Sequence, residues 1–379
     1  MTRRAATIDL NDLPFDAERI LDGLRSWIEC ESPSHDTAAV NAMMDLAQTE
    51  LFMMGAEITR IPGQPRAADS ILGRFPHPEP DKPGILILGH LDTVHPRGAM
   101  AWRRDGERCY GPGIFDMKGG NYIALEAIRQ LQAIGHVSAL PVSVFFTGDE
   151  EIGSPATRRL IESVAARYKY ILVPEPARRD GGLVVGRFAI ARFRVTTLGQ
   201  PSHAGLRLSE GVSAIREMAH QIIAIESMTN ENTSFSVGIV NGGQWSNVVS
   251  TRCEAEVLVA ATTDAHLANA SDAMQNLSPH GPTKVEVVPG PLRPVWNTKP
   301  IDRAIYDIAA EIAAEQGFEV PAQLSGGGSD GNFTGAMGLA TLDGLGPRGE
   351  GPHTLEEHIF IDSLPERARL IAGLLDRLA

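Results

Sequence analysis

The sequence predicts an α/β protein built around a mostly parallel sheet, with a smaller α+β domain inserted into it. Short apolar runs, such as residues 84–89, alternate with segments of helical periodicity, which is typical of strand–helix–strand units. Loops that contain acidic residues follow successive strands, so these loops are expected at one edge of the sheet. The alternation changes near Gly186 and resumes near Pro294, which indicates an insertion.

Residues 1–186 contain the first part of the larger domain. Helices are expected over 16–30 and 36–54, because apolar side chains recur on one face and Asp16 can cap the first helix. The other predicted elements are strands at 56–61, 70–75, 84–89, 141–146 and 170–173, helices at 119–135 and 154–168, and a long loop at 95–118.

Residues 187–293 form the predicted inserted domain. The expected elements are strands at 190–197, 234–240 and 252–260 and helices at 209–227 and 264–276. This pattern suggests a two-layer α+β sandwich in which helices cover one face of a sheet. Residues 294–379 return to the larger domain, with helices expected at 301–316 and 364–378.

Composition restricts the class of partner. The 379-residue chain has 34 basic and 47 acidic residues and a formal net charge of −13, which argues against nucleic acid or an acidic membrane surface. Cys30, Cys109 and Cys253 are far apart and form no CxxC pair, so neither a disulfide framework nor a zinc ribbon is indicated. No apolar run suits a signal peptide or a membrane span, and a cytoplasmic protein is expected.

Histidine and carboxylate residues occur where predicted strands end, and together they suggest a metal site. The strand at 84–89 leads into His90 and Asp92, and an i, i+2 pair in an extended chain faces one side. A histidine beside a carboxylate is typical of a zinc ligand and the group that orients it. The other candidates are Asp116, Glu150, Glu151, Glu175 and His353.

These donors are oxygen and nitrogen without thiolate, which suits Zn²⁺, Co²⁺ or Mn²⁺. They exceed the needs of one ion, so two metals about 3.5 Å apart, bridged by a carboxylate and a water, are predicted. Asp116 is the expected bridge because it lies between Gly113 and Gly119, where the backbone is permissive. Of Glu150 and Glu151, one can bind metal while the other holds the attacking water.

Each candidate has a simpler interpretation when taken alone. A histidine near an aspartate is more often a hydrogen-bonded loop residue, and a Glu-Glu pair more often begins a solvated helix. Glu175, between two prolines, could be an ordinary turn acid. The metal hypothesis therefore depends on the recurrence of these residues at successive strand ends.

Several motifs resemble a known enzyme family. They are Gly89-His-Leu-Asp-Thr-Val94, Gly111-Pro-Gly-Ile-Phe-Asp-Met-Lys-Gly-Gly120, Thr147-Gly-Asp-Glu-Glu-Ile-Gly-Ser154, Pro201-Ser-His-Ala-Gly205 and Gly326-Gly-Gly-Ser-Asp330. The set is similar to the zinc metallopeptidases that include acetylornithine deacetylase, succinyl-diaminopimelate desuccinylase, aminoacylase and the folate-cleaving bacterial glutamate carboxypeptidase. Residues 344–357 favour the glutamate carboxypeptidase branch, whereas residues 329–333 are more similar to the desuccinylase.

The resemblance implies a zinc-peptidase catalytic domain with two Zn²⁺ per chain. Asp92 would orient a ligand, Glu150 would be the general base and acid, and the Asp116–Met117 peptide bond would be cis. The implied ligands are His90 and Glu175 for one ion, Glu151 and His353 for the other, and Asp116 as the bridge.

The resemblance also implies residues that bind the substrate, an N-acyl amino acid or a short peptide. His203 would reach the active site of a partner subunit, which requires a homodimer formed through the inserted domain. Asn247 would lie near the substrate, Arg293 would bind a substrate carboxylate, and Gly328 and Ser329 would complete the site. Without the resemblance, His203 and Arg293 would be interpreted as surface residues.

One position departs from the family pattern. Members often end a strand of the inserted domain with Asp-x-Arg, whereas this chain has Glu256-Val-Leu258, so a possible carboxylate-binding arginine is absent. The predicted activity is hydrolysis of an amide bond next to a free carboxylate, which would release a C-terminal amino acid. The alternatives are a deacetylase or desuccinylase of N-acyl amino acids and, in another class, a non-catalytic binding protein of the same fold.

Overall fold

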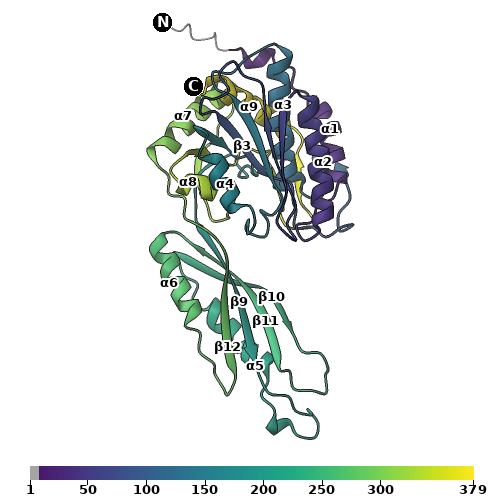
Figure 1. Ribbon diagram of the computed structural model, residues 1–379, viewed down its shortest axis with the longest axis vertical. Helices are drawn as coiled ribbons and strands as arrows, with labels where there is room; N and C mark the ends of the chain where they lie inside the picture. The colour runs from purple at the N-terminus through teal and green to yellow at the C-terminus, as the bar shows by residue number, and fades with distance from the viewer. Residues whose placement is uncertain (1–7) are drawn as a thin grey trace. The chain divides into compact units, whose positions relative to one another are not determined.

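The computed structural model describes residues 8–379, and the chain divides into two compact units (Figure 1). Unit 1 contains the chain up to Gly186 together with Asn297–Leu324 and Ser329–Ala379. Unit 2 contains Arg187–Trp296 and Ser325–Gly328. The sequence places the return to the larger domain after residue 293, and it does not assign Ser325–Gly328 to the inserted domain.

Unit 1 is organised around a sheet whose strands run in the order β1-β2-β6-β3-β7-β14. β3 pairs in parallel with β6 and β7, and β14 pairs in parallel with β7, whereas β1 and β2 form an antiparallel edge. The strands are β1 (Glu57–Ile61), β2 (Ser70–Arg74), β3 (Ile85–His90), β6 (Val142–Thr147), β7 (Tyr170–Leu172) and β14 (Ala340–Leu342). The predicted α/β fold class is confirmed.

Helices cover both faces of this sheet. Along β3, Ile85 and Ile87 belong to one buried cluster and Leu86 and Leu88 to another, as expected where strand side chains alternate. The first cluster includes residues of α1 (Ala17–Glu29), α2 (Thr37–Met53), α3 (Gly119–Ala133), α7 (Pro300–Glu315) and α9 (Ser363–Arg377), and the second includes residues of α4 (Arg158–Ala165) and α8 (Gly331–Ala336) (Figure 1). Within residues 8–379, no helix is both long and apolar enough to cross a membrane.

Local signals determine where helices begin. Asp16 and Asp36 each accept a hydrogen bond from a backbone N–H three residues further on, at 2.8 and 3.0 Å, so both cap their helices. The helix predicted over 154–168 is wrong in its first turn, because α4 begins only at Arg158. Ser154 has a φ of 54° and donates its hydroxyl to a buried aspartate at 2.5 Å, so it cannot begin a right-handed helix.

The segment 95–118, expected as a loop, contains two short strands. β4 (Arg103–Asp105) and β5 (Arg108–Tyr110) join β16 (His358–Phe360) and β15 (Gly349–Glu350) in the order β15-β16-β5-β4. Strands of this length are too short to show an alternating pattern, so the sequence does not reveal them. The other elements outside the insertion are η1 (Leu10–Asp12), η2 (Ile114–Lys118), β8 (Leu183–Arg187) and β13 (Ala322–Ser325).

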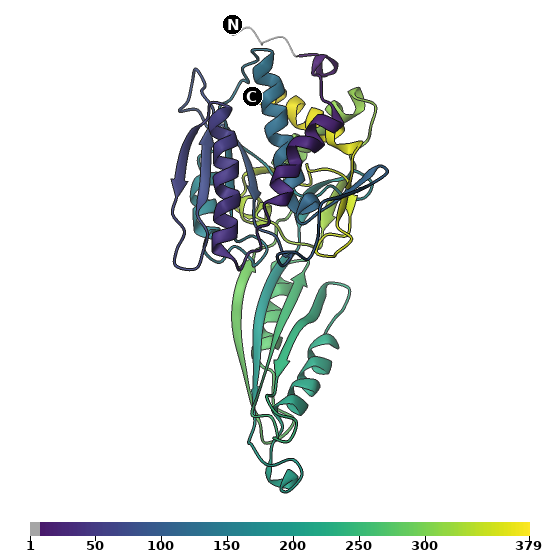
Figure 2. The same cartoon turned by 90° about the vertical axis from the view of Figure 1, so that its right-hand side faces the viewer.

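Unit 2 contains an antiparallel sheet in the order β10-β11-β9-β12 (Figure 2). Its strands are β9 (Ala189–Leu198), β10 (Thr233–Gly242), β11 (Arg252–Ala261) and β12 (Lys284–Arg293). Apolar residues of α5 (Ala214–Glu226) and α6 (Asp264–Gln275) pack against one face, and η3 (Leu208–Glu210) precedes α5. β12 is missing from the prediction because Pro289-Gly-Pro291 interrupts its alternation, and the pairing register shifts there.

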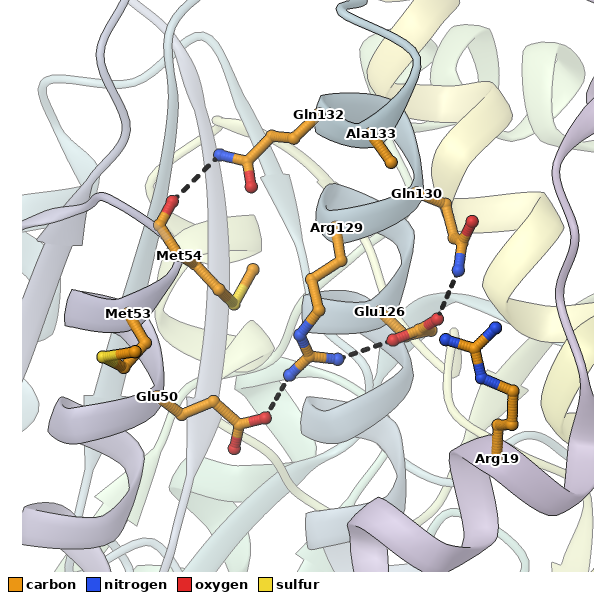
Figure 3. A pocket seen from close by; sticks show the side chains of 9 residues that line it. All are labelled: Arg19, Glu50, Met53, Met54, Glu126, Arg129, Gln130, Gln132 and Ala133. Carbon is orange, nitrogen blue, oxygen red and sulfur yellow. Dashed lines mark hydrogen bonds and ion pairs between the residues drawn. The ribbon is translucent and has the colours of Figure 1, made fainter.

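A surface pocket of unit 1 lies between α1, α2 and α3, and it contains a partly buried charge network (Figure 3). Arg129 forms ion pairs with Glu50 and with Glu126, the second at 2.6 Å. Trp27 donates its indole N–H to Glu50 at 2.6 Å. The side chains of Arg129 and Glu50 are only 26% and 22% exposed. Burial raises the pKa of Glu50, and the charge of Arg129 opposes that rise.

Replacing Arg129 with methionine should destabilise the fold by about 1–3 kcal/mol, because two partly buried carboxylates lose their cation. The loss should grow as the pH rises above the ordinary Glu50 pKa of 4.5. The reason is that removing the cation raises the pKa of Glu50 further, so ionising Glu50 in the folded variant costs more stability than it does in the unmodified protein. Chemical denaturation at acidic and at mildly alkaline pH measures both effects.

Arg19→Met is the matched control, since exposed Arg19 lines the same pocket. It should change stability by less than about 0.5 kcal/mol. Equal losses for the two variants would contradict a specific role for Arg129.

Candidate metal centre

The carboxyl ends of three neighbouring strands in unit 1 bring several of the predicted ligands together. β3 ends at His90, which pairs with the last residue of β6, and Glu150 and Glu151 follow β6 after a short turn. β7 pairs with the other edge of β3 and is followed by Glu175. The residues that follow parallel strands share one edge of the sheet, so these side chains converge.

Asp116 reaches the same place from the turn η2. Gly113 precedes this turn with a φ of 73°, and a Cβ there would lie only 2.4 Å from Cγ2 of Thr93. The turn therefore requires glycine at this position. The peptide bond between Asp116 and Met117 is cis, as the resemblance implied.

Asp116 lies between two histidines, with one carboxylate oxygen toward each. Its Oδ1 is 3.4 Å from Nε2 of His90, and its Oδ2 is 3.3 Å from Nε2 of His353. The same nitrogen of His353 is 3.1 Å from Oε2 of Glu151. The φ of His353 is 64°, a left-handed conformation that is uncommon outside glycine and is often found at functional sites. We refer to His353, Glu151 and Asp116 as the His353 half of the centre.

The His90 half of the centre comprises His90, Glu175 and Asp116. Nε2 of His90 lies 3.8 Å from Oε1 of Glu175 and 3.8 Å from Oε2 of Glu150. The ligand atoms of His90, Glu150 and Glu175 all lie within 4.8 Å of one another. Geometry alone therefore allows Glu150 to bind metal as well as to act as a base.

Hydrogen bonding determines which nitrogen of His90 faces these carboxylates. Nδ1 of His90 donates to the backbone carbonyl of Asp92 at 3.0 Å, because a carbonyl can only accept. Nε2 is buried and has no hydrogen-bond partner among the described residues. A nitrogen lone pair that faces carboxylate oxygens is stabilised only when a proton or another cation lies between them.

Asp92 supports the loop after β6 as well as His90. Its Oδ1 accepts from the backbone N–H of Glu150 at 3.1 Å, and its Oδ2 accepts from that of Glu151 at 3.2 Å. The hydroxyl of Ser34 also donates to Oδ2, at 2.7 Å. Asp92 is completely buried, and these hydrogen bonds connect the segment after β3 with the loop after β6.

The ionisable groups perturb one another strongly. Burial and the charge of Asp116 raise the pKa of Glu151 to about 7 and the pKa of Glu175 well above its usual range. Burial alone would raise the pKa of Asp116, but the neighbouring imidazoles of His353 and His90 bring it below its usual value. Hydrogen bonds to Asp116 and Glu151 raise the pKa of His353 to about 11. The cluster therefore contains more acidic groups than its histidines can neutralise.

The donor set fits a divalent metal. Imidazole nitrogens and carboxylate oxygens are the donors that Zn²⁺, Co²⁺ and Mn²⁺ accept. A divalent cation would pair with the Nε2 of His90 that has no hydrogen-bond partner, and it would offset the excess negative charge. This edge of the sheet is therefore a candidate metal centre.

The residues that the resemblance assigned to the substrate occupy separate places. In unit 2, the backbone N–H that follows His203 donates to the carbonyl of Asn247 at 2.9 Å, so their turns are neighbours. Also in unit 2, Arg293 lies against Gly328, where a Cβ would be 2.7 Å from Cδ of the arginine. Ser329 belongs to unit 1, is fully buried, and donates its hydroxyl to a buried aspartate at 2.6 Å.

Glu357, His95 and Lys118 are buried supporting residues that sequence reasoning does not identify. Each lies a few residues from a predicted ligand, and this proximity is the sequence signal that they offer. Lys118 donates to the carbonyls of Trp27 and Cys30, at 3.1 and 2.8 Å, and so connects η2 with the end of α1. Glu357 contacts the turn η2, and His95 contacts the segment that contains His353.

Comparison with known sequences identifies relatives over nearly the whole chain. The profile of peptidase family M20/M25/M40 matches residues 86–377. Carboxypeptidase G2 from Pseudomonas sp. strain RS-16 is 29% identical over 370 residues, which cover 94% of this chain and 88% of that protein. Succinyl-diaminopimelate desuccinylase from Rhodospirillum centenum is 26% identical over 385 residues, which cover 93% of this chain and 95% of that protein.

Comparison with solved structures identifies the same architecture. An M20 family metallo-carboxypeptidase from Sulfolobus solfataricus matches with a TM-score of 0.75 over 96% of this chain and 99% of its own chain. The two sequences are only 15% identical, so this likeness establishes the fold, and the activity has to be argued from the site.

Proposed function

The chain belongs to peptidase family M20/M25/M40 and is a metal-dependent hydrolase, and from this we propose that it is a dinuclear zinc enzyme that cleaves an amide bond next to a free carboxylate. The observation that carries the proposal is Asp116, with one carboxylate oxygen toward each histidine. The likeness to carboxypeptidase G2 supports release of a C-terminal amino acid. The likeness to a succinyl-diaminopimelate desuccinylase supports a second candidate, a deacylase of N-acetyl or N-succinyl amino acids.

The proposed ligands come from both halves of the centre. They are His90 and Glu175 for one Zn²⁺, Glu151 and His353 for the other, and Asp116 between them. Asp92 orients the imidazole of His90 by binding its Nδ1 side. A non-catalytic protein of this fold would be expected to lack a ligand or Glu150, and all of these residues are present.

Glu150 is proposed as the general base and acid. When bound, the metals would polarise the scissile carbonyl and make water more acidic. The carboxylate of Glu150 would take a proton from the attacking water and deliver it to the nitrogen of the leaving amine. Its side chain is 10% exposed and its backbone N–H is held by Asp92, so it is oriented and largely shielded from bulk water.

The metal content tests the two-metal form of the proposal. The purified protein should contain about two equivalents of metal per chain, and a chelator should abolish activity. Returning Zn²⁺ or Co²⁺ should raise the unfolding temperature of the chelator-treated protein, because the ions bind the folded chain. One tightly bound equivalent with full activity would refute the two-metal form.

Glu150→Gln should retain metal and substrate binding but lose turnover by on the order of 10²–10⁴-fold or more, because an amide cannot accept the proton. Steady-state kinetics and metal analysis of the same preparation measure both properties. Glu356→Gln is the control, since that glutamate side chain is 78% exposed. A Glu150→Gln enzyme that keeps its metals and most of its turnover would exclude this role.

The same variant tests the proposed homodimer through unit 2, in which His203 would act at the site of the partner subunit. Inactive Glu150→Gln chains mixed with inactive His203→Ala chains should regain part of the activity. The reason is that one of the two sites in a mixed dimer would then contain both intact residues. Verified heterodimers without any recovery would count against action in trans.

Arg293 is proposed to bind the free carboxylate of the substrate. A guanidinium can bind a carboxylate through two parallel hydrogen bonds, which a lysine cannot reproduce. The contact of Arg293 with Gly328 supports this role, because both belong to the predicted substrate set. Leu258 is 38% exposed and pairs across the sheet with Arg192, so an apolar group is presented where the family often has arginine. Substrates with apolar side chains should therefore be preferred to those with a second carboxylate.

Arg293→Ala should lower kcat/KM for carboxylate substrates by the equivalent of about 2–5 kcal/mol, because a bidentate charged contact is lost. The corresponding primary amides should be affected much less. Kinetics on paired acids and amides of N-acyl amino acids and dipeptides measure the difference, and Arg293→Lys should recover only part of the loss. Equal losses on acids and amides would assign Arg293 a structural role and remove the carboxylate requirement.

A further inference from the structure

Glu357 is a fully buried glutamate whose side chain binds the backbone of the turn that carries Asp116. Its Oε1 accepts hydrogen bonds from the N–H groups of Phe115 and Asp116, at 2.9 and 3.1 Å. Glu357 lies just before β16 and four residues after His353, so its carboxylate connects the segment that contains His353 with the turn η2. Two candidate ligands from distant parts of the chain are therefore joined through one carboxylate.

The second oxygen of Glu357 faces a third ligand-bearing loop. Oε2 is buried and has no hydrogen-bond partner among the described residues, and Nε2 of His95 is 3.5 Å away. His95 follows the segment with His90 and Asp92, and its Nε2 donates to the carbonyl of Thr354 at 2.9 Å. His95 thus binds the segment that contains His353, so Glu357 and His95 together connect all three loops.

The position of Asp116 is sensitive to this connection, because its two carboxylate oxygens serve different halves of the centre. The distance from Oδ1 to His90 and the distance from Oδ2 to His353 are nearly equal, at 3.4 and 3.3 Å. Both oxygens belong to one rigid carboxylate group. Any shift of the η2 backbone therefore changes the geometry of the His90 half and the His353 half together.

We propose that Glu357 is a positioning residue that fixes Asp116 between the two halves, so that its loss weakens metal binding in both halves at once. The inference rests on the proposed ligand set. Groups that orient metal ligands typically contribute 10–100-fold to metal affinity. A glutamine keeps one acceptor oxygen, but it places an N–H₂ donor where the second oxygen of Glu357 faces Nε2 of His95, which is itself a donor. It should therefore replace Glu357 only in part.

The test uses Glu357→Leu, which cannot accept either hydrogen bond, and Glu357→Gln, which keeps one acceptor oxygen. Glu356→Gln is the matched control, because it changes the neighbouring, exposed glutamate. Chelator-treated proteins are titrated with Co²⁺ in competition with a chromophoric chelator, and the visible spectrum of the bound Co²⁺ is recorded. Thermal unfolding of the metal-free proteins shows whether each variant is folded.

Glu357→Leu should lower the Co²⁺ affinity of both halves by about 10–100-fold and alter the Co²⁺ spectrum. Glu357→Gln should lie between Glu357→Leu and the unchanged control. His353→Ala, by contrast, should weaken mainly one of the two ions. A folded Glu357→Leu variant with unchanged affinities, or a loss confined to one ion, would overturn the inference.

The possible failures can be told apart. If the unmodified protein binds fewer than two Co²⁺, the proposed two-metal function fails before any variant is considered. If it binds two and the Glu357 variants bind like the control, only the positioning role fails. If Glu357→Leu does not fold, Glu357→Gln decides, and an unchanged affinity and spectrum in that variant would overturn the inference.

Discussion

The burial of several carboxylates at one edge of the sheet is the constraint on which the surrounding structure depends. Burial and, after it, the negative charge of Asp116 raise the pKa values of Glu151 and Glu175. Such a cluster can stay ionised in a folded chain only if cations are present among the oxygens. The pKa values of the two histidines are raised, so protons can supply this compensating charge, and a bound divalent ion would displace them. The charge balance at this edge of the sheet therefore depends on which cations are bound there.

Two buried carboxylates hold the backbone of candidate ligands in the same way. Asp92 accepts hydrogen bonds from the backbone N–H groups of Glu150 and Glu151, and Glu357 accepts them from Phe115 and Asp116. In both cases a buried carboxylate holds the main chain of a candidate ligand and of its neighbour. This arrangement fixes the backbone and leaves the ligand side chains available. Asp92 also adds negative charge around the centre, because its pKa is lowered although the group is buried.

Sequence reasoning succeeds where the signal is local. The apolar run of β3 and the capping residue Asp16 determine their elements within a few residues, and the order of strands and acids then places the candidate ligands at one edge. It fails where structure depends on distant partners or on very short elements. Glu357 binds an N–H group 242 residues earlier in the chain, and a contact over this separation leaves no periodic pattern in the sequence. Likewise, the roles suggested for His203 and Arg293 come from resemblance, because a polar residue on a turn or a strand end has no pattern that distinguishes it.

The turn η2 shows how such distant contacts complement one another. Its backbone does not follow a regular helix, since Asp116 and Met117 have non-helical dihedral angles, so its polar groups need partners from elsewhere. At its beginning, N–H groups are taken by the carboxylate of Glu357. At its end, the buried ammonium of Lys118 donates to carbonyls at the end of α1, where a helix leaves such acceptors unsatisfied. The carboxylate of Glu357 holds the N–H groups at the start of the turn, and the ammonium of Lys118 binds the end of the turn to α1. Asp116 is therefore fixed from both sides by groups that do not themselves belong to the proposed ligand set.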